Sequence, residues 1–524
     1  MPLRDLLREN ERAAVPLRIC AESGPWPLHG SAAAKALEAL ALAGRAGGEL
    51  MEHAGLGVAR LARALAPSAG LVEIWCGPGN NGGDGYVAAR RLHQAGTAVR
   101  VRECGVPGRL PADAAQARRR AQDAGVALGS PAQAQGDAAV PPDLVVDALL
   151  GLGTTRAPEG VLADAIGRIG AASASGALVL AVDLPSGLHP DTGQPLGDAV
   201  VRADHTLALL SLKPGLFTAH GRDLAGTVWF DRLGHRGGGV PGDAARPTAW
   251  LAGPSRRAAL PHASHKGRRG DAWVVGGAGG MLGAAALAAR AALAAGAGRV
   301  YVSLLARDER SDLDPIRPEL MHRPFEAASA QLLEGCTAIV GCGGGEAVRE
   351  CLPRLLAKAP RLVLDADALN HIAGAPELQR LLRGRAERGQ ASVLTPHPLE
   401  AARMLGTGSA AVQADRLAAA TTLAQHSAAV VVLKGSGTVV AAPAGLPRIN
   451  PTGNAALATA GTGDVLAGWL GGLWAQAPGS DAFEVACAAV WQHGHAADVA
   501  RPFTENRGAP LLAGDLITAL ASSA

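Results

Sequence analysis

The sequence has 524 residues, of which 48% are hydrophobic but only 3% aromatic, and its formal net charge is +3. A chain of this length exceeds what one hydrophobic core serves and predicts two to four domains. So small a net charge argues against a nucleic-acid or membrane-surface partner. The most apolar stretch, residues 281–298, contains Arg290 and is too weak for a membrane span.

Seven cysteines without a C-x-x-C pair, and an N-terminus with early charges and no apolar run, predict a reducing, cytoplasmic location. Cys76 and Cys342 are predicted to be packed free thiols. Only five of the 49 basic residues are lysines. Three of them, Lys213, Lys266 and Lys434, lie in glycine-containing segments, where a flexible point charge differs from the planar guanidinium of arginine.

Short aliphatic runs alternate along the chain with Ala/Leu/Arg segments of helical period, which is typical of parallel sheets with crossover helices. The predicted strands are 71–76, 98–104, 143–150, 177–184, 205–212 and 226–231 in the first half, and 271–276, 299–305, 337–341, 361–366, 391–395 and 429–434 in the second. The Gly- and Pro-rich segment 233–250 lacks periodicity and is predicted to join two α/β domains, 1–240 and 250–524. Residues 1–25 and 131–136 are predicted to lack regular structure.

In the first half, the strand at 71–76 leads into GPGNNGGDG (77–85) and a helical segment. A glycine-rich turn at this place lets backbone N–H groups approach a phosphate, although a purely structural turn has the same pattern. Polar residues also follow the next predicted strands. Because the carboxyl ends of parallel strands share one crevice, six side chains are expected to converge: Asn80, Asn81, Asp84, Asp147, Asp183 and Ser186. Such a pocket suits a hard cation or acid/base chemistry, and helix capping or turns remain the alternative for the aspartates.

The ordered set MEHAG, GPGNNGGDG, DALLGLG, AVDLPSGLHPDTG and LKPG, within residues 30–232, resembles the NAD(P)H-hydrate epimerase domain. That family has a Rossmann-like fold and interconverts the R and S hydrates of NADH and NADPH at C6. The resemblance implies that Asn81, Asp147 and Ser186 hold a potassium ion and that Asp183 is the acid/base catalyst. It implies a hydrate site of Asn80, Asn81, Gly82, Gly83, Asp84, Gly151, Leu152, Gly153, Thr154, Thr155, Arg156, Ala157 and Asp183. In DALLGLG the chain departs from the family, which usually has an aromatic residue before the glycines.

In the second half, Gly461, Thr462 and Gly463 stand directly before Asp464 and an apolar helical run. A helix N-terminus can hold a transferring phosphoryl group while an aspartate takes the proton of the attacking hydroxyl. A plain N-cap is the alternative for Asp464. Five more segments follow or join predicted strands and are expected to share its crevice: HKGRRGDAWVVGGAGGMLGAA, IVGCGGG, LDADALN, TPHPLE and VLKGSGTVV.

In order, these segments resemble the ADP-dependent NAD(P)H-hydrate dehydratase family, of ribokinase-like fold, over about residues 255–520. The resemblance implies a nucleotide site for ADP or AMP of Lys434, Gly435, Ser436, Gly437, Thr438 and Gly463. It also implies that the S-hydrate contacts Ala284, Gly341, His397 and Asp464. ADP would phosphorylate the C6 hydroxyl with Asp464 as the base, and elimination would restore NAD(P)H and release AMP and phosphate. Cys342 and Leu399 depart from the family, which usually has Pro and Gly there.

Mg²⁺ is expected to shield the nucleotide phosphates, with Asp365 and Asp367 as candidate ligands, although a structural role at the strand end is favoured for both. His493 and His495 lack the companions of a metal site and are predicted to be surface or capping residues.

The two resemblances together imply a bifunctional repair enzyme, an isomerase joined to a lyase, acting on hydrated NADH and NADPH with ADP as co-substrate and expected to be a homo-oligomer. The alternative is a ribokinase-like sugar or vitamin kinase fused to a nucleotide-binding scaffold, because a phosphate-binding helix start and a base would serve that reaction equally well.

Overall fold

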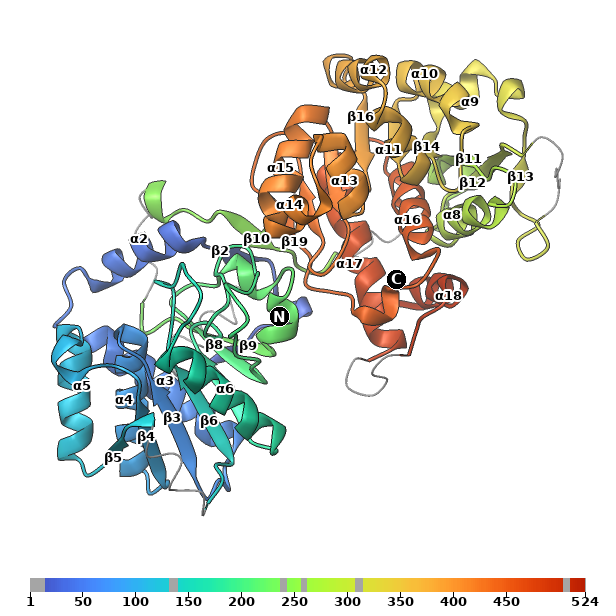
Figure 1. The fold of residues 1–524 in the computed structure, drawn as a ribbon. Helices are drawn as coiled ribbons and strands as arrows, with labels where there is room; N and C mark the ends of the chain where they lie inside the picture. The colour runs from blue at the N-terminus through green and yellow to red at the C-terminus, as the bar shows by residue number, and fades with distance from the viewer. Residues whose placement is uncertain are drawn as a thin grey trace. The chain divides into compact units, whose positions relative to one another are not determined.

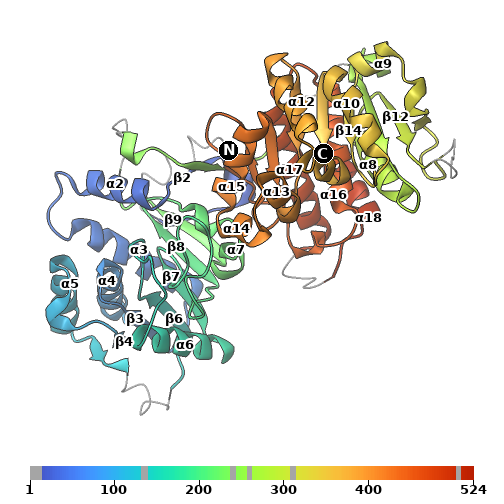
Figure 2. The ribbon, with the colours of Figure 1, turned by 45° about the horizontal axis from the view of Figure 1, so that its top comes forward.

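The computed structural model describes residues 15–131, 140–235, 243–255, 262–306, 314–502 and 509–523. The chain divides into two compact units, Met1–Leu251 and Ala252–Ala524. Each unit contains a sheet whose central strands are parallel (Figures 1 and 2). The predicted class, two α/β units, is therefore confirmed.

The sheet of the first unit has the strand order β1-β9-β8-β7-β6-β3-β4-β5. Its strands are β1 (Leu17–Arg18), β3 (Val72–Cys76), β4 (Val99–Glu103), β5 (Ala127–Gly129), β6 (Leu144–Ala148), β7 (Leu178–Val182), β8 (His205–Leu209) and β9 (Thr227–Asp231). Its helices are α2 (Ser31–Leu42), α3 (Glu49–Leu65), α4 (Asn80–Gln94), α5 (Ala112–Asp123), α6 (Val161–Ala174) and α7 (Gly221–Leu224). An antiparallel pair joins β2 (Trp26–Leu28) to β10 (Ala249–Leu251).

Helices cover both faces of this sheet. One core lies between the sheet and the helices α3, α4 and α5, and a second lies between its other face and α6 (Figure 1). Because both faces are covered, β3 and β6 are buried at every position and read as continuous apolar runs rather than as alternating ones. The charged residues within these otherwise apolar strands have partners. Glu73, for example, accepts from Arg100, Arg102 and the indole N–H of Trp75.

In the second unit the strands run in the order β13-β12-β11-β14-β15-β16-β17-β18-β19. They are β11 (Asp271–Gly276), β12 (Arg299–Leu304), β13 (Met321–His322), β14 (Thr337–Val340), β15 (Arg361–Leu364), β16 (Ala391–Leu394), β17 (Val430–Leu433), β18 (Val439–Ala441) and β19 (Arg448–Ile449). One face packs on α8 (Leu282–Ala294), α16 (Thr462–Gln476), α17 (Ala482–Ala500) and α18 (Ala513–Ser523). The other packs on α9 (Ala330–Gly335), α10 (Val348–Lys358), α11 (Ala366–Ala373), α12 (Pro376–Glu387), α13 (Pro398–Leu405) and α15 (Arg416–Ser427), with α14 (Ser409–Ala414) beside them.

Small residues bring two helices of the second unit into backbone contact. A Cβ atom added to Gly468 of α16 would clash with the carbonyl group of Ala288 in α8, and one added to Gly472 would meet Ala292. The low aromatic content of the chain therefore has a structural counterpart, because this interface is filled by closely approaching backbones rather than by large rings.

All twelve predicted strands are confirmed, with ends shifted by up to three residues. Several short strands were missed, because two- and three-residue strands carry no detectable period. Two of them correct the predictions directly: β1 lies inside the segment 1–25 that was expected to lack structure, and β10 ends the joint predicted at 233–250. The loop predicted at 131–136 falls, apart from Pro131, outside the described residues. No helix in the described part of the chain has the length and apolar character needed to cross a membrane.

Two candidate active sites

A cavity of about 760 Å³ opens in the first unit where β3, β6, β7 and β8 end. It is lined by most of the residues that were expected to contact substrate: Asn80, Asn81, Asp84, Gly151, Leu152, Gly153, Thr154, Thr155, Arg156, Ala157 and Asp183. Gly82 and Gly83 do not line it. They are buried in the first turn of α4, where a Cβ atom would clash with the backbone of Gly77 or with Met51. These two glycines therefore serve close packing, while the asparagines and the aspartate of the loop face the cavity.

Asp183 follows β7 with a φ of 67°, a backbone conformation that non-glycine residues rarely adopt. Its Oδ1 accepts from the backbone N–H of Leu209 at 3.1 Å and forms an ion pair with Lys213. The Lys213 side chain is only 2% exposed, and its other two protons go to the carbonyl oxygens of Leu209 and Ser211, both at 3.0 Å. Among the described residues, Oδ2 of Asp183 has no hydrogen-bond partner. One oxygen of a fixed, ion-paired carboxylate is thus available to the cavity.

Two further carboxyl groups, Glu38 and Asp84, line the same cavity. Burial raises the pKa of Asp84 well above its ordinary value, and the charges of Asp183 and Glu38 raise it further. Burial, followed by the charge of Asp183, also raises the pKa of Glu38. The cavity therefore combines a carboxylate held by a cation with two carboxyls whose pKa is raised, and such a set can supply both a base and an acid.

Asp147, Asn81 and Ser186 adjoin this cavity. Asp147 is fully buried near the end of β6 and accepts from the Ser186 hydroxyl at 2.7 Å, the Ser186 N–H at 2.8 Å and the Leu149 N–H at 3.2 Å. Burial raises its pKa to about 6 in spite of these hydrogen bonds. The side-chain nitrogen of Asn81 is buried and has no hydrogen-bond partner among the described residues. A buried carboxylate that no cation in the described part of the chain pairs with, beside a hydroxyl and an unsatisfied amide, is an environment that a cation would stabilise.

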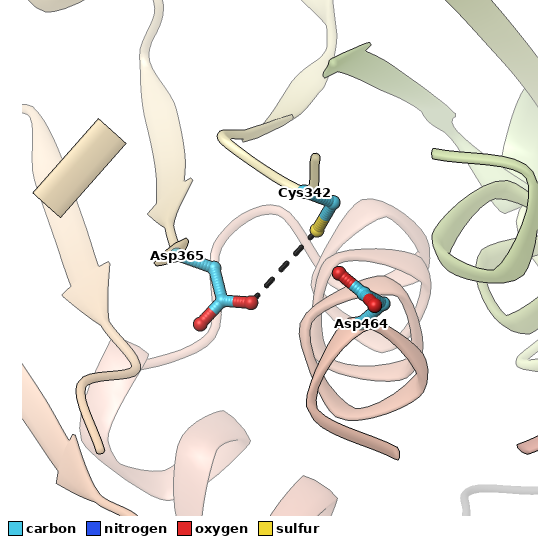
Figure 3. Close-up of side chains that lie close together, drawn as sticks. All are labelled: Cys342, Asp365 and Asp464. Carbon is cyan, nitrogen blue, oxygen red and sulfur yellow. Dashed lines mark hydrogen bonds between the residues drawn. The ribbon is translucent and has the colours of Figure 1, made fainter. Parts of the chain in front are cut away.

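In the second unit, Asp464 is the third residue of α16, whose N-cap is Gly461 in the left-handed conformation. Asp464 is therefore not the N-cap, which removes the plain capping role. Burial and the nearby charge of Asp365 raise its pKa to about 6, and the positive charge of Lys434 opposes this rise. Figure 3 shows Asp464, Asp365 and the thiol of Cys342 facing one another. One ligand atom from each lies within 4.8 Å of the others.

Lys434 follows β17 and is directed at the start of α16. Its Nζ lies 2.8 Å from Oδ1 of Asp365 and 4.0 Å from Glu400, and 3.3 Å from the position of a Cβ atom added to Gly463. Burial disfavours its charge, but Asp365 and Glu400 hold the pKa of Lys434 above its ordinary value. A charged ammonium therefore stands beside the free N–H groups of a helix N-terminus, which is an arrangement suited to a phosphate group.

The remaining predicted residues belong to the loops and helix starts around Lys434 and the first turn of α16. His397 caps α13, and its Nε2 lies 3.2 Å from the buried carboxylate of Glu400. Gly341 has a φ of 113° and lies against the backbone of Asp365, and Ala284 packs on the same glycine loop. Gly435, Ser436, Gly437 and Thr438 form the turn between β17 and β18, where the Thr438 hydroxyl donates to the Gly435 carbonyl at 3.1 Å. Asp367 accepts from the Gly345 N–H at 2.8 Å.

Four residues in or beside these sites were missed: Lys213, Glu38, Glu400 and Arg416. The scarcity of lysine in the chain could have indicated a functional role for Lys213. The spacing of a capping box in T-P-H-P-L-E could have indicated the place of Glu400. Arg416, which is almost fully buried, donates to the carbonyl oxygens of Leu433 and Lys434, both at 3.1 Å, and so supports the turn that follows β17. Nothing in the sequence around Glu38 or Arg416 indicated these positions.

The prediction of a surface or capping residue is wrong for His493, whereas His495 is partly exposed. His493 is buried in α17, a ring nitrogen lies 3.0 Å from the carbonyl oxygen of Thr462, and burial lowers its pKa to about 4. His495 stacks on Trp491 with 4.6 Å between the ring centroids. His493 thus supports the first turn of α16. The prediction that Cys76 and Cys342 are packed free thiols is confirmed.

Two family models match the chain, one for each unit. The model described as YjeF-related protein N-terminus matches residues 47–215, and the model described as NAD(P)H-hydrate dehydratase matches residues 272–521. Among solved structures, an ADP/ATP-dependent NAD(P)H-hydrate dehydratase from Bacillus subtilis, co-crystallised with ATP and Mg²⁺, is 32% identical with a TM-score of 0.42, covering 52% of this chain and 93% of that one.

Curated relatives match over nearly the whole length. A protein of Escherichia coli named bifunctional NAD(P)H-hydrate repair enzyme is 37% identical over 490 residues, which is 90% of this chain and 88% of that protein. A protein of Leishmania major with the same name is 36% identical over 530 residues, covering 91% and 88%. The chain therefore belongs to the family of bifunctional NAD(P)H-hydrate repair enzymes.

Proposed function

We propose that residues 1–240 epimerise the R and S hydrates of NADH and NADPH, and that residues 250–524 dehydrate the S form with ADP. The observation that carries this proposal is the match of both units to relatives named for the paired activity, over 90% of the chain. The two sites agree with it, since the first offers paired acid and base groups and the second a base at a phosphate-binding helix start.

In the second unit the reaction begins with the C6 hydroxyl of the S-hydrate. Asp464 takes its proton, and the hydroxyl oxygen attacks the β-phosphorus of ADP, so that AMP leaves. Lys434 and the N–H groups at the start of α16 hold the transferring phosphoryl group. The C6–O bond of the phosphate ester then breaks, phosphate departs, and loss of a proton from C5 restores NAD(P)H. A neutral His397, whose pKa burial and Lys434 both lower, would contact the hydrate without adding charge.

In the first unit, epimerisation requires the C6 hydroxyl to leave and water to return to the opposite face. The nitrogen of the reduced ring can supply the electron pair that expels the hydroxyl. A protonated carboxyl, Asp84 or Glu38, would donate the proton that turns the hydroxyl into water. The free oxygen of Asp183 would accept a proton from the water that adds to the other face, and Lys213 holds that carboxylate in its orientation.

Mg²⁺ would be held in the second unit chiefly through the phosphates of the nucleotide, with carboxylate oxygens of Asp365 and Asp367 as protein ligands. Both residues offer an oxygen donor set that suits this hard ion. When bound, Mg²⁺ would neutralise charge that develops on the phosphoryl group.

The test of the proposed function follows the return of NADH absorbance from purified S-hydrate, with ADP and ATP in parallel. We expect recovery of NADH with equal amounts of AMP and phosphate when ADP is used. A sugar or vitamin kinase of the same fold would leave a stable phosphorylated alcohol instead. An absence of NADH under all conditions, with intact folded protein, would falsify the dehydratase assignment.

The dehydratase rate should depend on pH through Asp464. Its pKa is raised to about 6, so the base is ionised above that pH and protonated below it. We expect the rate with S-hydrate to be level near neutrality and to fall about tenfold per pH unit below about pH 6. Initial rates of AMP release measure this without relying on NADH, which is unstable in acid. A rate that stays level to roughly pH 5 would exclude Asp464 as the base.

We further propose that Asp147, Ser186 and Asn81 hold a potassium ion, which would balance the buried carboxylate of Asp147. Replacing K⁺ by choline should then slow R-to-S conversion several-fold and leave S-hydrate recovery unchanged. Asp147→Asn should abolish the response to K⁺, because the charge to be balanced is gone. Asp143→Asn is the matched control, since Asp143 precedes the same strand but caps the N–H groups of Gly70 and Leu71. An equal K⁺ response in wild type and Asp147→Asn would place the ion elsewhere.

A further inference from the structure

A thiol and two carboxylates meet at the floor of the second site. Cys342 follows β14, Asp365 follows β15, and Asp464 lies in the first turn of α16. The Sγ atom of Cys342 lies 3.9 Å from Oδ2 of Asp365, and the three ligand atoms lie within 4.8 Å of one another (Figure 3). Cys342 and Asp365 are 1% and 2% exposed, and Asp464 is partly exposed. Two of the three side chains are thus buried, and the third, Asp464, is accessible to solvent.

The two oxygens of Asp365 have different surroundings. Oδ1 receives the ammonium of Lys434 at 2.8 Å and the hydroxyl of Thr395 at 2.7 Å. Oδ2 is directed at the thiol of Cys342, which is its only hydrogen-bond partner among the described residues, and at 3.9 Å this contact is weak. A buried carboxylate oxygen therefore points into the cluster without an N–H or O–H group to satisfy it, and it remains available to a cation.

The charges in the cluster also favour a divalent ion. With the thiol ionised, Cys342, Asp365 and Asp464 carry three negative charges, and Lys434 supplies one positive charge. The remaining two negative charges would be neutralised by a single divalent cation. Without such a cation, the thiol keeps its proton. Burial raises the pKa of the Cys342 thiol, and the two aspartates raise it further.

We propose that Cys342, Asp365 and Asp464 form a site for Zn²⁺, and that Zn²⁺ bound there inhibits dehydration by engaging the base Asp464. Three protein ligands with an open fourth position match the coordination that protein-bound zinc adopts beside a substrate. Zinc bonds of about 2.3 Å to sulfur and about 2.0 Å to oxygen place the ligand atoms roughly 3.5 Å apart, so atoms that now lie within 4.8 Å of one another need to close by up to about 1.3 Å. The thiolate selects zinc over Mg²⁺, which prefers oxygen ligands.

Binding of the metal releases the thiol proton to solvent and changes no oxidation state. The inhibitory part of this inference rests on the proposed dehydratase function, whereas the binding part does not. Metal binding and NADH recovery therefore have to be measured separately.

Cobalt(II) is the probe for binding, because a cobalt–thiolate bond gives a charge-transfer absorption band. The full chain, first freed of metal by dialysis against a chelator, is titrated with Co²⁺. We expect a thiolate-to-cobalt band in the wild type that saturates at one ion per chain and disappears when Zn²⁺ is added. Cys342→Ser keeps the size of the side chain and should lose the band, as should Cys342→Ala. Cys351→Ala, which removes another buried cysteine from α10, should keep it.

Inhibition is measured as NADH recovery from S-hydrate with excess Mg²⁺ and ADP, each variant being compared with its own rate in chelator. We expect one equivalent of free Zn²⁺ to lower the wild-type rate at least tenfold, and the rate of Cys342→Ser by less than twofold. No cobalt band in the wild type, or an equal band in Cys342→Ser, would overturn the zinc site. A band with unchanged dehydration would overturn inhibition. If metal-free protein recovers no NADH at all, the proposed function fails, and the cobalt titration still decides the zinc site.

Discussion

Asp464→Asn is expected to lower NADH recovery from S-hydrate by a factor of about 10² to 10⁴, the usual contribution of a positioned general base. The substitution preserves the shape of the side chain and the first turn of α16, but asparagine cannot accept the proton of the C6 hydroxyl. The N–H groups at the helix start and Lys434 remain, so ADP should still bind. The measurement combines initial rates of AMP release with calorimetric titration of ADP.

The matched control for this variant is Asp481→Asn. Asp481 also stands at a helix start, where it caps α17 through the N–H groups of Phe483 and Glu484. Its replacement should change stability by about 1 kcal/mol or less and leave the rate unchanged. If Asp464→Asn turns over within a few-fold of wild type, another group removes the proton.

Lys213→Met is expected to abolish conversion of R-hydrate while leaving S-hydrate recovery intact. Methionine fills the same space but removes the positive charge that pairs with Asp183. A buried carboxylate that has lost its cation is disfavoured in its charged form, so Asp183 would become a poorer proton acceptor. Breaking a buried ion pair also destabilises a protein by about 3 to 5 kcal/mol. The first unit of the variant should therefore unfold at a lower temperature than that of the wild type.

The two hydrates make this experiment self-controlled within one protein. R-hydrate plus ADP yields NADH only after epimerisation, whereas S-hydrate plus ADP reports the second unit alone. We expect at least a 100-fold loss with R-hydrate, in line with removal of an acid/base catalyst. Lys266→Met, which removes an exposed lysine of another glycine-containing segment, should affect neither rate. Equal losses with both hydrates would mean that the variant is globally unfolded. The role of the Asp183–Lys213 pair in epimerisation would then be measured with Asp183→Asn.

The sequence predicted those parts of the sites that depend on local pattern. Apolar runs that end at Asp147 and Asp183 placed both residues at one edge of a parallel sheet, and AGTGDVLAG placed Asp464 in a first helical turn. Partners from distant parts of the chain carry no such pattern. Lys213 is 30 residues from Asp183, and Lys434 is 69 residues from Asp365. Such pairings follow from the strand order, which no local period encodes.

Other misses have the same physical origin. The burial of His493 follows from the packing of α17 along the side of α16, and a histidine between small residues looks the same in sequence whether it is exposed or buried. The short strands β1, β10 and β18 were missed because their extended conformation is imposed by a neighbouring strand rather than by their own two or three residues.

The glycines that bring α16 against α8 have a consequence for how this enzyme can change by mutation. Where side chains fill an interface, a larger residue can be absorbed by a new rotamer or by a vacancy nearby. At Gly468 and Gly472 the neighbouring atoms belong to the backbone of α8, so even one methyl group has to move a whole helix. The glycines themselves belong to α16, which carries Asp464 in its first turn. Mutation is therefore constrained at positions of α16 that contact α8 rather than the reacting atoms, and sequence variation should accumulate instead on the exposed helices of the opposite face.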